Sequence, residues 1–352
     1  MILDPLLDLL RGKAITVPPM DGALRPNTAL DEAEVLLEAE QPDNLCFDGS
    51  RILFSSGRRV LALPSSKAAA PQVVAEHDVP ISALAASPAG SLATAFDDGR
   101  LLIDGRELPR PEGLGSATAL AFADPATLLL CQGSARHPAS DWVLDLMEKN
   151  ATGSLWRIEL ASGRASRLAG NLAFPYGVMA RADGIVLAES WRHRLLGLPA
   201  AGGPVRELAA KLPGYPARLA PAADGGAWLC LFAPRNRLIE FVLGEDDYRG
   251  EMMREVPREH WIAPALSSGR SFLEPLQCGA VRTMGIHKPW SPTRSYGLVL
   301  RLDPALRPVA SLHSRANGAR HGVTSVLEAG GRVLAAAKGG GAILDLGERA
   351  GR

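Results

Sequence analysis

Short apolar runs separated by Gly, Asp and Pro turns recur along the whole chain. Two longer stretches about forty residues apart follow one pattern, residues 171–194 (NLAFPYGVMARADGIVLAESWRHR) and residues 211–237 (KLPGYPARLAPAADGGAWLCLFAPRNR). Each stretch has a proline beside an aromatic residue, a short strand, an Ala-Asp-Gly turn, a second strand and a basic end. A supersecondary unit repeated at this spacing is typical of a propeller or a solenoid.

Four further units have the same alternation of apolar runs and turn residues. Runs rich in Val, Ile, Leu and Phe between such turns indicate strands. The six inner strands are expected to start near Pro42, Pro80, Ser116, Asn171, Lys211 and His321. Propeller blades are four-stranded sheets arranged around a channel. We therefore predict an all-β fold, a six-bladed β-propeller with four-stranded blades over residues 36–352. A β-sandwich or two smaller β domains is the alternative.

Three segments depart from this rhythm. Residues 1–35 indicate an N-terminal adaptor, and residues 135–152 and 244–295 are insertions with short helical stretches, DWVLDLMEKN in the first and REVPREHWIAPAL in the second. Long ordered loops in compact folds are usually lids or binding loops. The second insertion therefore either covers the channel or braces one end of the propeller. Its aromatic and histidine residues, which favour an ordered cover, are His260, Trp261, His287, Trp290 and Tyr296.

The composition excludes several classes of partner. Lys plus Arg and Asp plus Glu are equal at 38 each, which leaves no basic surface for nucleic acid. Asp4 and Asp8 interrupt the first apolar run, and no stretch reaches the length of a membrane span, so we expect a cytoplasmic protein without a membrane partner. Of four cysteines, Cys46, Cys131 and Cys230 lie in apolar strand-like runs and are expected to be buried thiols.

In these repeats the chain resembles the strictosidine synthase-like proteins, within the wider gluconolactonase and paraoxonase-like group of six-bladed propellers. The resemblance covers roughly residues 40–346. The matching stretches are FPYGVMARADGIVLAESWRHRL, LPGYPARL, TGSLWRIELASG, YGLVLRLDPALRPVASLH and GVTSVLEAGGRVLAAA. The resemblance implies a propeller with a small-molecule site in its channel.

Many of these relatives hold one divalent cation, usually calcium, through an acidic residue of the first blade and an Asn and an Asp of later blades. The matching positions here are Asp43, Tyr176 and Ala217, and Arg218 follows. Calcium needs six to eight oxygen ligands, whereas alanine supplies none and a guanidinium repels a cation. We therefore expect no cofactor and disfavour calcium, with Asp43 and Asn44 as the ligands of any residual site.

The resemblance also suggests a second chemistry, the condensation performed by true strictosidine synthases. Their catalytic glutamate lies near the start of the last inner strand, where this chain has Thr324. A threonine cannot supply the same acid/base function. Glu328 lies close in sequence. A condensing enzyme or an isomerase of secondary metabolism therefore stays an alternative only.

The first residues of the inner strands are expected to face the channel, because side chains alternate along a strand. A histidine is a natural general base for water, and a guanidinium or a phenol can stabilise the oxyanion that follows. We predict a hydrolase of ester or lactone bonds that acts on a small metabolite. The catalytic candidates are His321, Asp43 and Arg218, and the substrate-binding candidates are Tyr176, Thr324, Ser82, Thr118 and Trp290.

The alternative is a non-catalytic propeller that binds a ligand or a partner. In that case His321 is a solvated turn residue and Tyr176 fills the former metal position. His321 within hydrogen-bond reach of Asp43 would favour the enzyme, whereas Arg218 paired to Asp43 would favour the binder. Glu189 and Arg194 are expected to form a structural ion pair between strands. The oligomeric state leaves no signal in the sequence.

Overall fold

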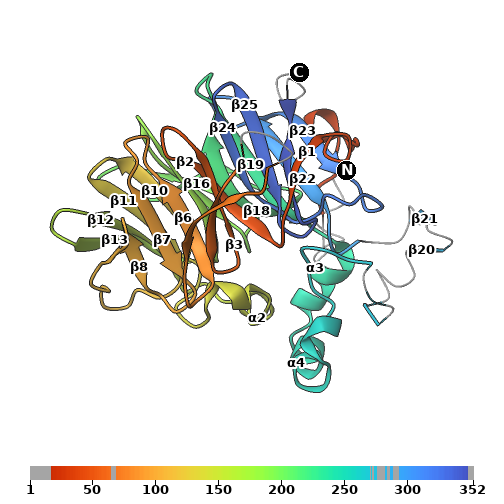
Figure 1. Ribbon diagram of the computed structural model, residues 1–352. Helices are drawn as coiled ribbons and strands as arrows, with labels where there is room; N and C mark the ends of the chain where they lie inside the picture. Colours follow the sequence, from red (N-terminus) through yellow and green to blue (C-terminus); the bar gives the residue numbers. More distant parts are fainter. Residues whose placement is uncertain are drawn as a thin grey trace.

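The computed structural model describes residues 17–64, 69–269, 271, 273–275 and 293–347, and the backbone of residues 282–283 and 286–287. Six four-stranded antiparallel sheets stand in a ring around a central channel, which confirms the predicted six-bladed propeller (Figure 1). The innermost strands, which contact their counterparts in neighbouring blades, are β2, β6, β10, β14, β18 and β24. All six begin close to the positions expected from the repeats.

The strands of the first three blades, from the channel outward, are β2 (Pro42–Phe47), β3 (Ile52–Ser56), β4 (Arg59–Ala62) and β5 (Gln72–Glu76); β6 (Ile81–Ala86), β7 (Leu92–Phe96), β8 (Leu101–Ile103) and β9 (Arg106–Glu107); and β10 (Ala117–Asp124), β11 (Thr127–Gln132), β12 (Gly153–Glu159) and β13 (Arg164–Leu172).

The strands of the last three blades are β14 (Pro175–Arg181), β15 (Gly184–Glu189), β16 (Arg194–Leu198) and β17 (Arg206–Ala209); β18 (Gly214–Pro221), β19 (Ala227–Pro234), β22 (Gly297–Leu302) and β23 (Pro308–Ser314); and β24 (Val323–Ala329), β25 (Arg332–Ala337), β26 (Ala342–Asp345) and β1 (Glu34–Glu38). A short hairpin, β20 (Arg282–Thr283) and β21 (Ile286–His287), lies between β19 and β22.

The central strands of the blades are apolar on both faces because each blade is packed between two others. Every residue of β15 and of β19 is buried. Leu129 and Leu155 of the third blade form one cluster with Val178 and Leu187 of the fourth. Full burial of such a side chain contributes about 1.5–3 kcal/mol. This packing explains why these strands read as continuous apolar runs.

The ring is closed by strands from opposite ends of the chain. β1 pairs antiparallel with β26, with Glu34 opposite Asp345, and completes the last blade. Residues 17–33, described above as part of an adaptor, lie against the fifth blade. There, Leu30 is fully buried, and its backbone nitrogen donates to the His313 carbonyl at 3.0 Å. Closure leaves no blade with a missing fourth strand.

Both insertions carry the predicted helices, but in the second the helices lie further upstream. The first insertion contains η2 (Ala139–Asp141) and α2 (Trp142–Met147). The second insertion begins directly after β19, earlier than the expected residue 244, and contains α3 (Arg237–Gly244), α4 (Asp246–Glu255) and η3 (Arg258–His260). The prediction of a helix over REVPREHWIAPAL was therefore wrong for most of that stretch. Asn236 starts α3 because its side chain accepts from the Leu238 backbone nitrogen at 2.9 Å. Pro257 follows the extended residue that ends α4.

The two insertions pack together beside the channel. Figure 1 shows α2, α3 and α4 on the same side of the ring. Two ion pairs join the insertions, Arg258 to Asp141 at 2.7 Å and Lys149 to Asp246 at 3.1 Å. Their shared apolar core consists of Met147, Val242, Met252, Trp261 and Ala263. Among the helices of the described residues, none has the length and apolarity that a bilayer span requires.

Candidate functional site

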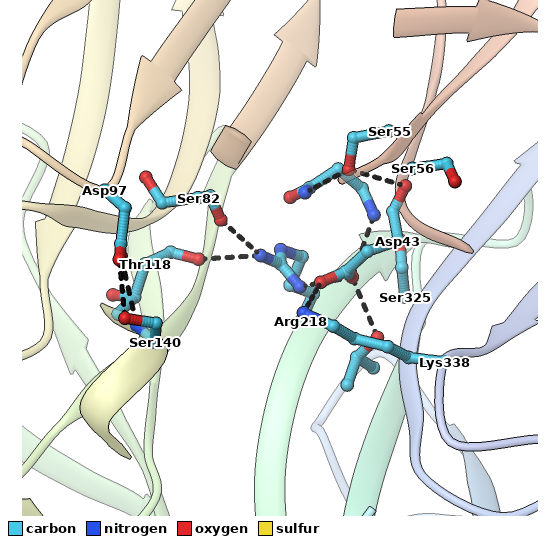
Figure 2. Close-up of polar contacts among 12 residues, drawn as sticks. Asp43, Ser55, Ser56, Ser82, Asp97, Thr118, Ser140, Arg218, Ser325 and Lys338 are labelled. Atoms are coloured by element: carbon cyan, nitrogen blue, oxygen red, sulfur yellow. Dashed lines mark hydrogen bonds and ion pairs between the residues drawn. The ribbon is translucent and has the colours of Figure 1, made fainter. Parts of the chain in front are cut away.

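Asp43, near the start of β2, is the centre of a buried polar cluster in the channel. Only 3% of the residue is exposed. Its carboxylate accepts hydrogen bonds from Arg218 Nη1 at 2.7 Å, Thr324 Oγ1 at 2.8 Å and Lys338 Nζ at 3.0 Å (Figure 2). A first-blade carboxylate therefore joins residues of the fifth and sixth blades.

Arg218, on β18, reaches across the channel to the opposite blades. Its Nη2 atom donates to the carbonyl oxygens of Ser82 at 3.1 Å and Thr118 at 2.9 Å. Its guanidinium carbon lies 4.8 Å from the centre of the Tyr176 ring, within the range of a cation–π contact. Arg218 thus fills the channel centre and contacts four other blades through Asp43, Ser82, Thr118 and Tyr176.

The charges of this cluster hold one another in the ionised state. Burial raises the pKa of Asp43, but the positive charges of Arg218 and Lys338 outweigh burial, so this pKa lies below its usual value. Burial lowers the pKa of Lys338, but the attraction of Asp43 outweighs it, so this pKa lies above its usual value. At neutral pH the cluster has two cations and one carboxylate. Lys338 is then an ammonium group and no amine nucleophile.

A cavity of about 210 Å³ opens beside the cluster, with Asp43 and Lys338 in its wall. Both insertions contribute to it. Its other polar side chains are Gln41, Ser55, Ser82, Asp97 and Ser140, and its apolar side chains are Pro80, Ile81, Ala139, Trp142, Tyr176 and Leu266. The insertion after β19 therefore supplies part of the wall, through Leu266, as does the insertion after β11, through Ala139, Ser140 and Trp142.

Asp97 places a second carboxylate in the cavity wall. It follows β7 and accepts from the Ser140 hydroxyl at 2.5 Å and the Ser140 backbone nitrogen at 3.0 Å. Figure 2 shows this pair on one side of Arg218, with Asp43 and Lys338 on the other. Sequence reasoning missed both Asp97 and Lys338. The same sequence feature could have indicated both as site residues. Each is a charged residue directly after an apolar strand, at the channel end of a blade.

The structure brings most of the predicted site residues together. Asp43, Arg218 and Thr324 are hydrogen-bonded, and Tyr176 packs on Arg218. Ser82 contributes to the cavity wall, although its hydroxyl oxygen is buried. Thr118 contributes its carbonyl oxygen, whereas its hydroxyl is fully buried and donates to the Cys131 carbonyl at 3.1 Å.

His321 lies outside this cluster. Its Nδ1 atom is 2.8 Å from Ser295 Oγ and its Nε2 atom is 2.8 Å from the Arg315 carbonyl oxygen. Its side chain is buried and does not belong to the cavity wall formed by the described residues. The structure therefore does not place the predicted base beside Asp43. Trp290 lies outside the described residues.

Neither residue considered for condensation chemistry offers a free acid or base in the cavity. The Thr324 hydroxyl donates to Asp43. Glu328 accepts from Trp228 Nε1 at 2.6 Å and from the Ala223 backbone nitrogen at 3.1 Å, so it braces the outer turn of the fifth blade.

The residues present do not fit the divalent cation that the family resemblance implies. The Asp43 carboxylate faces two protein cations, and Ala217 has no oxygen in its side chain. Asn44 Oδ1 is buried without a hydrogen-bond partner among the described residues, but it is a single neutral oxygen. No group of three or more His, Cys, Asp or Glu side chains in the described part of the chain could hold a metal ion. The absence of calcium stays a prediction for titration.

Three residues of the AESWRHR motif have structural roles. Glu189 is fully buried and accepts from Arg194 Nε at 2.5 Å, which confirms the predicted ion pair between β15 and β16. Trp191 stacks on Phe174 with ring centres 4.4 Å apart. Its Nε1 atom donates to Asp145 of α2 at 2.8 Å. The motif thus fixes the helix that carries Trp142 into the cavity wall.

Comparisons with protein-family profiles and with curated proteins give no match. Several solved structures share the fold. A gluconolactonase from Xanthomonas campestris has a TM-score of 0.55 at 12% identity and covers 88% of this chain and 87% of its own. The calcium-binding protein regucalcin from Agrobacterium tumefaciens has a TM-score of 0.54 at 14% identity, with coverages of 86% and 84%. A luciferin-regenerating enzyme has a TM-score of 0.50 at 14% identity, with 86% of each chain covered. The chain is therefore a six-bladed propeller with the architecture of the gluconolactonase and regucalcin structures.

Proposed function

We propose that the channel cavity binds a small anionic metabolite and that Arg218 and Lys338 take the place of a divalent cation. The observation that carries this proposal is the charge of the buried cluster, in which two cations share one carboxylate. A buried positive charge in excess is unfavourable unless an anion accompanies it. Lys338 lines the cavity and has two further N–H donors beyond its bond to Asp43.

The second carboxylate of the cavity, Asp97, does not remove the expected preference for an anionic ligand. Asp97 lies on the opposite side of the cluster and already accepts from Ser140 and, at 3.4 Å, from the Ser116 hydroxyl. The cavity is therefore polarised, with its cationic end at Lys338. An anionic group is expected at that end.

The arrangement favours binding over the predicted His321-dependent hydrolysis. Asp43 is paired with Arg218, and His321 is bonded to Ser295 and Arg315. A carboxylate with a lowered pKa and several donors is a poor general base. The cavity of about 210 Å³ is smaller than the roughly 300–1,000 Å³ of typical sites for drug-sized ligands. The ligand is accordingly a single small molecule.

Binding of small carboxylates in excess chelator tests this proposal. Isothermal titration calorimetry compares acetate, lactate and phenylacetate with the corresponding neutral amides. We expect at least one carboxylate to bind and its amide to bind at least tenfold more weakly. Lys338→Met should weaken carboxylate binding at least tenfold. The control is Lys149→Met, which removes a surface lysine paired with Asp246 and should change nothing. Equal binding of acids and amides would contradict the proposal.

A second candidate function is hydrolysis of a small ester or lactone without a metal ion. It is favoured by Asp97, a carboxylate in the cavity wall, and by the gluconolactonase that shares the fold. In this reaction a water oxygen attacks the carbonyl carbon, Asp97 takes a proton from that water, and the oxyanion forms near Lys338. The ester C–O bond then breaks, and the departing alkoxide takes the proton from Asp97.

Assays with phenyl acetate and γ-butyrolactone in EDTA test the hydrolase. Turnover that is unchanged by EDTA and falls at least a hundredfold in Asp97→Asn is expected if Asp97 is the base. Ser140→Ala is the matched control, because it removes one hydrogen bond to Asp97 and leaves its carboxylate in place. Absence of turnover in the wild-type protein would leave binding as its function.

A further inference from the structure

We infer that the ligand is an aromatic carboxylate and that Trp142 is the residue that selects its ring. This inference rests on the proposed function and specifies the ligand of the same cavity. Two observations support it: some polar groups of the wall are already hydrogen-bonded within the protein, and aromatic side chains form part of the wall.

Ser82 and Lys338 have hydrogen-bond donors that are unused within the described part of the chain, and the two residues lie on opposite sides of Arg218 (Figure 2). Ser82 Oγ is buried and has no partner among the described residues. Lys338 makes one hydrogen bond within the described part of the chain, to Asp43. Lys338 keeps two N–H donors beyond its bond to Asp43, and the oxygens of a carboxylate can accept from them. The ligand's anionic group is therefore expected at Lys338.

Of the other polar side chains of the wall, those of Ser55, Asp97 and Ser140 are bonded within the protein, and Gln41 is exposed. Ser140 is bonded to Asp97, and the Ser55 hydroxyl accepts from Asn44 Nδ2 at 2.8 Å. A ligand with many hydroxyls would need partners that these bonded groups no longer offer, and each polar group left unmatched weakens binding. The body of the ligand is therefore expected to be apolar.

The apolar part of the wall is dominated by two aromatic rings, Trp142 and Tyr176. The Trp142 ring is held edge-to-face against Phe232, with ring centres 5.2 Å apart. Its helix α2 is anchored through the bond between Asp145 and Trp191. Aromatic pairs attract each other beyond what their contact area alone contributes. A rigid indole in the wall thus favours an aromatic ring over a saturated ring of the same size.

Calorimetry on the full chain separates this inference from the proposed function. The probes are phenylacetate, cyclohexylacetate, gluconate and phenylacetamide. We expect phenylacetate to bind about three- to tenfold more tightly than cyclohexylacetate, and gluconate to bind more weakly than both. Trp142→Leu should bring the ratio of the two Kd values for the ring acids close to one. Trp142→Phe should keep most of the wild-type ratio of these two Kd values.

The control variant is Trp156→Phe, at a partly buried tryptophan of β12 whose Nε1 atom is bonded to Ser154 and which does not line the cavity. Cyclohexylacetate or gluconate binding as tightly as phenylacetate would overturn the inference and leave the proposed function intact. Phenylacetamide binding as tightly as phenylacetate would overturn the proposed function. If circular dichroism shows that Trp142→Leu does not fold, the wild-type protein and Trp142→Phe still test the inference. The preference for the aromatic acid is measured on the wild-type protein.

Discussion

Asp43 holds together residues that lie far apart in the chain. Arg218 is 175 residues away, and Lys338 is 295 residues away. Each of these cations is buried or partly buried and would be unfavourable without the carboxylate. The carboxylate to which the family resemblance assigns a metal ion is here the shared counter-charge of two side chains of the protein itself.

Asp43→Asn should therefore destabilise the fold strongly, by about 3–5 kcal/mol, because it leaves two cations without a counter-charge. Urea unfolding followed by circular dichroism measures this loss. The double variant Asp43→Asn/Lys338→Met should be more stable than Asp43→Asn alone, since only one cation then remains. A double variant that is destabilised by the sum of the two single effects would show that Asp43 and Lys338 do not interact.

At the scale of elements, glycines of the last blade allow the second insertion to approach the channel. A Cβ atom on Gly339 would lie 1.8 Å from the Leu266 carbonyl oxygen, which is far inside van der Waals contact. Gly322 has a φ of +63°, and its Cβ atom would lie 2.6 Å from the same oxygen. Leu266 is the residue of this insertion that lines the cavity. The cavity wall therefore depends on backbone packing that only glycine permits.

Gly339→Ala should displace Leu266 and weaken binding of the small carboxylate several-fold, with a loss of stability of about 1–3 kcal/mol from overpacking. Calorimetry and urea unfolding measure the two effects. The control is Gly244→Ala at the end of α3, where an added Cβ meets nothing within 4 Å. That control should be neutral or slightly stabilising. Unchanged ligand affinity in Gly339→Ala would argue against a role for Leu266.

The helix α3 is joined to the propeller through Glu240, which accepts from Arg235 at 3.0 Å and lies 3.4 Å from His193 Nε2. Burial raises the pKa of Glu240, but the hydrogen bonds and charges of His193 and Arg235 lower it to about 2. The folded pKa is below the unfolded value of ~4.3. The stabilisation is therefore complete above that value and is lost as the pH falls toward about 2.

Glu240→Gln should thus cost about 2 kcal/mol at pH 7 and much less near pH 2. Unfolding curves at both pH values measure the difference. Glu207→Gln serves as the control, because Glu207 is half exposed in its pair with Arg194 and should cost under about 1 kcal/mol at either pH. A loss in Glu240→Gln that did not change with pH would mean that the charge of Glu240 is not what holds α3.

At the scale of the whole molecule, the channel is closed by side chains that join all six blades. Arg218 contacts the first four blades, and Lys338 and Thr324 tie the sixth to Asp43. In such a ring, a cation that bound Asp43 would have to displace both protein cations. The whole-molecule arrangement thus opposes a metal ion more strongly than the loss of one ligand would.

Addition of millimolar calcium should therefore leave the thermal midpoint of the protein unchanged within about 1 °C. Tight binding to the folded state would raise stability by several kcal/mol at a hundred times the Kd or more. Differential scanning calorimetry in EDTA and in calcium makes the comparison. A clear rise in the midpoint with calcium would contradict the fit argued from Asp43, Arg218 and Lys338.

The sequence alone determined the architecture, because strands and turns are encoded locally. The repeats around Pro175 and Gly214 predicted the inner strands of two blades, and they also placed Tyr176 and Ala217 at the positions where the resemblance implies metal ligands. The pairing of Glu189 with Arg194 was predictable for the same reason, since both residues lie within one hairpin.

Only the tertiary structure decided which side chains share the cavity. Lys338 reaches Asp43 because the ring closes, and Trp142 and Leu266 reach the wall because two insertions pack on each other and on the propeller. The position of His321 in a repeat predicted that it faces the channel. In the structure, its ring is hydrogen-bonded to Ser295 and lies outside the Asp43 cluster. Such contacts depend on the packing of distant segments, which the alternation of apolar and polar residues along a strand does not record.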